Sequence, residues 1–136
     1  MASVLIVDDE PAIRETLREI LVQHQYRVLT AADGREAMSL FLKERNSVRL
    51  VLTDLAMPVM GGVALVRALR ALDPDLKVIA MSGLDDDDKR TELAALGVGD
   101  VLMKPLHPAQ LLGAMRRHLS TGRSSSPWEM PTGAVT

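Results

Sequence analysis

Near the start of the chain stands the stretch Val4-Leu5-Ile6-Val7-Asp8-Asp9, in which four apolar residues are followed at once by two carboxylates. An apolar run without alternation is typical of a strand covered by helices on both faces of a parallel sheet, because neither side meets water. Four further short runs are also predicted to be strands. They are Arg27-Val28-Leu29-Thr30, Leu50-Val51-Leu52-Thr53, Lys77-Val78-Ile79-Ala80-Met81 and Val101-Leu102-Met103.

The segments after these runs have helical spacing, with apolar residues three and four positions apart. Their boundaries carry start and stop residues, such as Pro11 and Asp33-Gly34 at starts and Gly97 at an end. The apolar stripes are Ile13, Leu17, Ile20, Leu21 and His24; Ala37, Leu40 and Phe41; Val63, Val66, Leu69 and Arg70; a segment of about 86–96; and Leu111, Leu112, Met115 and Leu119 after Pro108.

A strand followed by a helix, five times over, predicts an α/β fold with one five-stranded parallel sheet. Right-handed crossovers place helices on both faces of such a sheet, and ligands bind at the carboxyl ends of its strands. The 136 residues fit a single domain. We expect this domain to cover residues 1–119, because residues 120–136 begin with a Ser-rich, linker-like segment and show no periodicity.

Composition excludes several classes of function. A net charge of -2 and the lack of a basic face give no reason to expect direct nucleic-acid binding. The absence of cysteine excludes disulfides, thiolate nucleophiles and Cys-ligated zinc. No apolar run is long enough for a membrane span, and the first residues do not resemble a signal peptide, so a cytoplasmic protein is expected.

Polar residues stand directly after four of the predicted strands, so all should meet at one edge of the sheet. They are Asp8, Asp9, Asp54, Ser82 and Lys104. Two carboxylates about 4 Å apart repel each other by roughly 1 kcal/mol in water and roughly 4 kcal/mol at an effective dielectric constant near 20. Lys104 offsets part of this repulsion, and a divalent cation would offset more. Oxygen ligands of this kind favour Mg2+ over zinc.

A carboxylate can attack phosphorus to form an aspartyl phosphate, provided that the charge on the phosphoryl oxygens is neutralised. Mg2+ and Lys104 could supply that neutralisation, and the hydroxyl group of Ser82 could donate a hydrogen bond to a phosphoryl oxygen. The residues therefore indicate a site for Mg2+ and a phosphoryl group.

Four motifs in order give the sequence a specific likeness. They are Val7-Asp8-Asp9-Glu10-Pro11, Thr53-Asp54-Leu55-Ala56-Met57-Pro58-Val59-Met60-Gly61-Gly62, Met81-Ser82-Gly83, and Gly97-Val98-Gly99-Asp100-Val101-Leu102-Met103-Lys104-Pro105. Over residues 3–119 the chain resembles the response-regulator receiver family of two-component signalling. The resemblance implies a flavodoxin-like sheet with strand order 2-1-3-4-5.

The same resemblance implies roles for individual residues. Asp54 would be the phosphorylation site. Asp8 or Asp9, with Asp54 and the backbone carbonyl of Ala56, would hold Mg2+. Lys104 would contact the phosphoryl group.

Ser82 would be the hydroxyl residue that responds to phosphorylation, and the Lys104-Pro105 bond would be cis. The phosphoryl donor would be a histidine kinase or a histidine phosphotransfer domain. The downstream effector is not identified by the sequence, and the chain itself would act as a signalling domain rather than an enzyme. It could be a stand-alone regulator or a receiver from a longer protein such as a hybrid histidine kinase.

One position departs from the family pattern. Many receivers have Tyr or Phe in the fifth strand where this chain has Val101, judged by the spacing to Lys104. Because valine cannot swing a ring between buried and exposed positions, we expect the output to depend on movement of the fourth helix and its loop, or on docking of a partner.

Two other functions stay open at this point. A phosphoaspartate hydrolase resembling the haloacid dehalogenases would use a similar sheet, but its second aspartate follows two residues after the first, which Val7-Asp8-Asp9-Glu10 does not match. A receiver-like scaffold that never takes phosphate would not need Asp54, Ser82 and Lys104 together.

Overall fold

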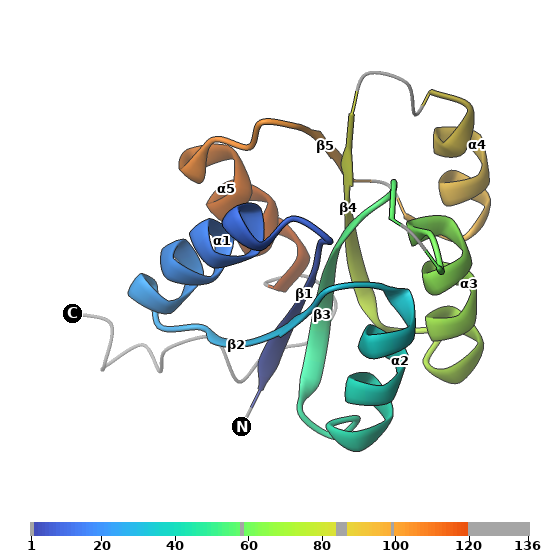
Figure 1. The fold of residues 1–136 in the computed structure, drawn as a ribbon, viewed down its shortest axis with the longest axis horizontal. Helices are drawn as coiled ribbons and strands as arrows, with labels where there is room; N and C mark the ends of the chain where they lie inside the picture. The colour runs from blue at the N-terminus through green and yellow to red at the C-terminus, as the bar shows by residue number, and fades with distance from the viewer. Residues whose placement is uncertain (1, 58, 84–86, 99, 120–136) are drawn as a thin grey trace.

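The computed structural model describes residues 2–57, 59–83, 87–98 and 100–119, without the side chains of Asp87 and Asp88. Strands and helices alternate along this part of the chain (Figure 1). The strands are β1 (Ser3–Val7), β2 (Arg27–Ala31), β3 (Val48–Asp54), β4 (Lys77–Ser82) and β5 (Val101–Met103). The helices are α1 (Pro11–Gln23), α2 (Gly34–Lys43), α3 (Gly62–Leu72), α4 (Asp87–Ala95) and α5 (Pro108–Leu119).

The five described strands form one parallel sheet in the order β2-β1-β3-β4-β5, which confirms the predicted fold and strand order. The register pairs Val7 with Thr53 and Asp54 with Met81. The ends of β1, β3 and β4 are therefore level, and the residues that follow them lie side by side.

The sheet separates two apolar layers (Figure 1). Helices α1 and α5 cover one face, and α2, α3 and α4 cover the other. Residues of β1 alternate between the layers: Val4 and Ile6 pack toward α1 and α5, whereas Leu5 and Val7 pack toward the opposite helices. All of β1 is buried, which explains why its sequence is apolar without alternation.

The helix starts follow local sequence signals. Pro11 occupies the first turn of α1, where its missing N–H leaves no hydrogen bond unmade. Asp33 caps α2: its Oδ1 accepts a hydrogen bond from the amide of Glu36 at 2.9 Å. The Glu36 carboxylate in turn accepts from the amide of Ala32 at 3.2 Å, which completes a reciprocal cap.

Two expectations about helices need correction. His24 does not extend the buried stripe of α1, because the helix ends at Gln23 and His24 is an exposed capping residue. Leu65, which the predicted stripe of α3 omits, is fully buried. Apolar residues spaced three and four positions apart show which side of a helix is buried, but they do not show how wide that buried side is.

One other expectation lies outside the description, because residues 120–136, the predicted tail, are not described. Among the described residues, no helix combines the length and the apolar character that crossing a membrane requires.

Candidate functional site: an acidic cluster at the carboxyl end of the sheet

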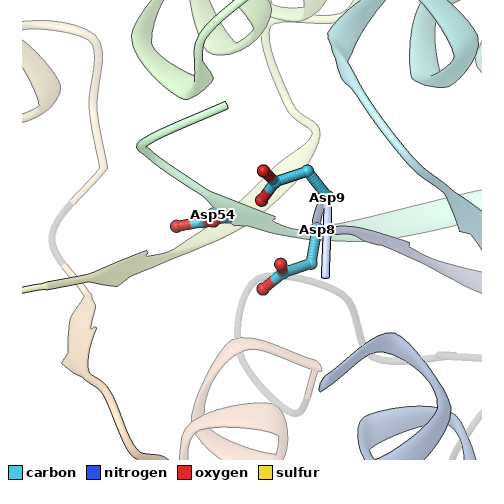
Figure 2. A group of neighbouring side chains, drawn as sticks. All are labelled: Asp8, Asp9 and Asp54. Carbon is cyan, nitrogen blue, oxygen red and sulfur yellow. The ribbon is translucent and has the colours of Figure 1, made fainter. Parts of the chain in front are cut away.

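Three carboxylates meet where β1 and β3 end. Asp8, Asp9 and Asp54 each offer an oxygen, and these oxygens lie within 4.8 Å of one another. Figure 2 shows the three side chains extending to the same side of the strand ends. Asp8 is fully buried and Asp54 is 4% exposed, whereas Asp9 is exposed. The sequence predicted this group but not the difference in burial between the two adjacent aspartates.

Lys104, which directly follows β5, reaches the two buried members of the cluster. Its Nζ lies 3.0 Å from Asp8 Oδ2 and 3.1 Å from Asp54 Oδ2. The contact with Asp8 is an ion pair, and the described residues offer Asp8 Oδ2 no other polar partner. The buried charge of Asp8 therefore depends on a lysine that Asp54 shares.

The backbone around Asp8 is held from α1. Asp8 Oδ1 accepts a hydrogen bond from the amide of Glu10 at 2.9 Å. The guanidinium group of Arg14 donates to the backbone carbonyl of Asp8 at 2.7 Å. Arg14 was missed by the sequence analysis. Its position one turn into α1 could have indicated this role, because that part of the helix lies close to the end of β1.

The pKa of Asp54 is raised above its usual range. Burial is the main cause, and the neighbouring charge of Asp8 adds to it, while Lys104 and the amide of Ala56 act in the opposite direction. Burial also opposes the charge of Lys104, yet the two carboxylates outweigh it and raise the pKa of the ammonium group. One lysine therefore does not neutralise the cluster.

The two hydroxyl groups nearest to Asp54 bond to backbone carbonyls. Ser82 is buried at the end of β4, and its Oγ donates to the carbonyl of Gly83 at 2.9 Å. Thr53 Oγ1 donates to the carbonyl of Asp54 at 2.9 Å. The amide of Ala56 donates to Asp54 Oδ1 at 3.4 Å. Ser82 thus lies at the predicted edge, but its hydroxyl group donates its hydrogen bond to a backbone carbonyl and not to a carboxylate of the cluster.

The peptide bond between Lys104 and Pro105 is cis, as predicted. The amide of Lys104 also donates to the carbonyl of Ser82 at 2.9 Å, which joins the segment after β5 to the end of β4. Lys104 is thereby fixed at both its backbone and its ammonium group.

The sequence matches the family of the response regulator receiver domain over residues 4–116. The chain belongs to this family. A receiver domain is a signalling domain rather than a classical enzyme. The acidic cluster lies at the carboxyl ends of the strands, the edge at which doubly wound sheets generally bind ligands.

Individual relatives agree with this assignment. The chain is 36% identical over 113 residues to response regulator MprA of Mycolicibacterium vanbaalenii, covering 83% of this chain and 48% of MprA. Chemotaxis response regulator CheY4 of Vibrio cholerae superimposes with a TM-score of 0.80 at 36% identity, over 88% of this chain and 99% of that chain.

A third relative was solved with ligands. A chain of the CheX-CheY-BeF3-Mg+2 complex from Borrelia burgdorferi superimposes with a TM-score of 0.80 at 27% identity, covering 85% of this chain and 87% of that chain. The present chain spans about half the length of curated relatives such as MprA. The activity of those whole proteins does not carry over to it directly.

Val101 is the residue that the sequence analysis expects at the position of the family's ring. It pairs with Ala80 across the β4–β5 ladder and is partly buried against the layer of α2, α3 and α4. Its methyl groups lie in the same layer as Leu93, the buried residue of α4. The sequence prediction about its effect on output remains a prediction.

A second charged group of the receiver lies at the opposite, amino edge of the sheet. Asp100 precedes β5, and its Oδ2 lies 3.0 Å from Arg117 Nη2 and 2.8 Å from His118 Nε2 at the end of α5. Burial alone would raise the pKa of Asp100, but hydrogen bonds from Arg117 and His118 hold it below its usual range. The sequence analysis missed this group, because only the fold brings residues 100 and 117 together.

A cavity of about 390 Å3 opens beside the acidic cluster, between α1 and the segment that follows β5. Its lining is largely apolar, and Lys104 borders both the cavity and the carboxylates. The lining residues are Ala12, Ile13, Thr16, Leu17, Ile20, Met81, Lys104, Pro105 and Leu106.

Proposed function

We propose that this receiver accepts a phosphoryl group on Asp54 and that the donor is the phosphohistidine of a histidine kinase or of a histidine phosphotransfer domain. The observation that carries the proposal is the position of Asp54: it is nearly buried at the end of β3, and its Oδ2 lies 3.1 Å from Lys104 Nζ and close to Asp8. This arrangement places a nucleophilic oxygen beside a fixed positive charge.

The acidic cluster fits Mg2+. Three carboxylates face one lysine, which Asp8 and Asp54 share, so this group of described residues lacks positive charge. Asp8, Asp9, Asp54 and the backbone carbonyl of Ala56 would hold the ion, which as a hard cation prefers oxygen ligands. When bound, Mg2+ supplies the charge neutralisation that phosphoryl transfer needs.

In the proposed reaction a carboxylate oxygen of Asp54 forms a bond to phosphorus while the phosphorus–nitrogen bond of the phosphohistidine breaks. The electron pair of that bond stays with the leaving imidazole, which then takes a proton from solvent. Lys104 binds a phosphoryl oxygen through its ammonium group. Ser82 would have to turn its hydroxyl group from the Gly83 carbonyl toward the phosphoryl group, which gives it the role of a switch.

The donor protein has a surface to approach. The cavity beside α1 is largely apolar, and it is bordered by Lys104, whose ammonium group contacts the acceptor carboxylate. We propose that apolar side chains of the donor occupy it during transfer, because buried apolar contacts hold two proteins together while the reacting groups align.

The output would depend on α4 and its preceding loop rather than on an aromatic ring, since Val101 occupies the ring's position. Phosphorylation would draw Ser82 toward Asp54 and so move the segment that begins at Gly83. NMR relaxation of residues 83–97 with and without beryllofluoride tests this hypothesis. Equal backbone mobility in the two states would count against it.

The proposed acceptor is tested by incubating the protein with acetyl phosphate and Mg2+ and measuring the mass of the intact chain. The wild type should gain one phosphoryl group that requires Mg2+ and is removed by hydroxylamine, as an acyl phosphate should be. Asp54→Asn should gain none. Asp100→Asn is the matched control, since it removes a carboxylate from the opposite edge of the sheet, and it should be phosphorylated like the wild type.

Other outcomes would favour the alternatives. If the wild type gains no mass and does not bind beryllofluoride, the chain is a scaffold rather than a phosphoacceptor. Steady turnover of an aryl phosphate, abolished by Asp8→Asn, would favour the hydrolase, whose nucleophile directly follows the first strand. No feature of the described residues favours either alternative over phosphoacceptance.

A further inference from the structure

The loop between β3 and α3 carries Ala56 and is held firmly at both ends. The amide of Leu55 donates to the carbonyl of Met81 at 3.1 Å, and the amide of Gly62 donates to the carbonyl of Leu55 at 3.0 Å. A Cβ atom on Gly62 would lie 2.3 Å from the carbonyl oxygen of Asp54. The start of α3 is therefore pressed against the acceptor's own backbone.

The far part of this loop is strained. Val59 has a φ of 70°, in the left-handed region that a β-branched residue rarely adopts. Its side chain is 73% exposed, so contacts of Val59 itself do not hold it there. Such a conformation persists only when neighbouring structure fixes it. The next residue, Met60, is partly buried against the layer of α2, α3 and α4 and can provide that anchor.

Met60 packs on the first residue of α2, Gly34. A Cβ atom on Gly34 would lie 2.7 Å from both the backbone oxygen and the Cγ of Met60, and 2.8 Å from its Cβ. Real Cβ atoms essentially never come this close to other heavy atoms. The space left by the missing side chain of Gly34 is thus filled by the loop.

The start of α2 is poorly able to move away from the loop. Its reciprocal cap fixes Asp33 and Glu36 on either side of Gly34. One turn further on, Ala37 is fully buried, and so is Phe41 after another turn. A side chain added at Gly34 would therefore displace Met60 and its loop rather than the helix.

We propose that Gly34 is a positioning residue for the phosphorylation of Asp54, acting through Met60 on the loop that carries Ala56. This inference rests on the proposed function, and it extends the site to a helix that contributes no side chain to the acidic cluster. Relieving the contact requires Met60 to move by several tenths of an ångström. Misplacement by about 1 Å can cost about a hundredfold in rate, so we expect a loss of about tenfold.

The experiment compares Gly34→Ala with Gly113→Ala. Both changes replace a helical glycine, but a Cβ atom on Gly113 would meet only Arg117, at an ordinary 3.7 Å. The phosphorylation rate with acetyl phosphate is measured against Mg2+ concentration and expressed per folded molecule, with the folded fraction taken from circular dichroism. Gly34→Ala should show about a tenfold lower rate or a similarly raised Mg2+ half-saturation, and Gly113→Ala should stay within about twofold of wild type.

A second pair separates positioning from a general structural defect. In a Met60→Gly background the contact with the side chain is gone, whereas the contact with the backbone oxygen remains. Adding Gly34→Ala there should therefore lower the rate by clearly less than the tenfold loss expected in the wild-type background. The inference is overturned if Gly34→Ala behaves like Gly113→Ala. If the wild type and Gly113→Ala are not phosphorylated either, the proposed function itself fails and this inference with it.

Discussion

The two edges of the sheet differ in the ratio of carboxylates to basic side chains. At the carboxyl edge two buried carboxylates, Asp8 and Asp54, share Lys104, whereas at the amino edge one carboxylate, Asp100, is shared by Arg117 and His118. The pKa of Asp54 is raised, with burial as the first cause, while the pKa of Asp100 is lowered because its hydrogen bonds outweigh its burial.

This difference separates a site from a structural contact. The fold leaves negative charge only partly compensated at the carboxyl edge and compensates it at the amino edge, where α5 contacts the residue before β5. An unbalanced buried group is a physical reason to expect function at the carboxyl edge.

The largest difference should appear when the basic partner is removed at each edge. Lys104→Met should slow phosphorylation by acetyl phosphate by about a hundredfold, because it removes a charge aimed at the phosphoryl oxygens. Arg117→Met should leave the rate within about twofold. Initial rates at saturating Mg2+ measure both. Similar losses in the two variants would show that the edges are not functionally distinct.

Removing one carboxylate charge should change stability in opposite directions at the two edges. In Mg2+-free buffer Asp8→Asn should raise the free energy of unfolding by about 1 kcal/mol, because it relieves repulsion and keeps the acceptor for the Glu10 amide. Asp100→Asn should lower it by about 1 kcal/mol. Thermal midpoints should shift by a few degrees either way. A lower free energy of unfolding for Asp8→Asn would contradict the idea that repulsion among the carboxylates destabilises the folded state.

The two carboxyl groups should titrate on opposite sides of the ordinary aspartate value of 3.8. Since the folded state raises the pKa of Asp54, this group's contribution to stability falls as the pH rises from 3.8 through its raised pKa. Asp100 behaves in reverse: its contribution is present above 3.8 and is lost as the pH falls through its lowered pKa. Side-chain 13C NMR of the Mg2+-free protein measures both, and Lys104→Met should move the Asp54 midpoint higher still.

The smallest effect should come from the exposed part of the amino-edge group. The side chain of Arg117 is 60% exposed, so water and salt screen its attraction to Asp100. Arg117→Met should lower the free energy of urea unfolding by no more than about 1 kcal/mol, and the difference should shrink at about 1 M salt. A loss that is large and independent of salt would mean that Arg117 acts through packing instead.

The sequence predicted the fold and the carboxyl edge well because both follow from short-range patterns. The apolar run Val4–Val7 is typical of a covered central strand, and a carboxylate placed directly after a parallel strand lies at the carboxyl edge of the sheet. The same logic located Asp54 and Lys104. Family resemblance, rather than periodicity, predicted the strand order and the cis bond before Pro105.

What the sequence could not predict depends on contacts between distant residues. Nothing in the adjacent pair Asp8-Asp9 indicates that one side chain is buried and the other exposed, because that follows from the turn into α1. The Ser82 hydroxyl group has several possible acceptors, and only the folded backbone places the Gly83 carbonyl within reach. The contact of Gly34 with Met60 likewise joins two segments that only the packing of α2 on the acceptor loop brings together.

Helix α4 is attached to the domain by very little. Among its described side chains only Leu93 is fully buried, while Arg90, Thr91 and Glu92 face solvent. Burying one leucine contributes about 1.5–3 kcal/mol, and exposed contacts such as the Arg67–Glu92 ion pair add little, so a small minority of molecules should have this helix detached at any moment. Hydrogen exchange should then be fast in α4 and slow in β1. A minority conformation of this size means that a signal need only redistribute shapes that the chain already samples.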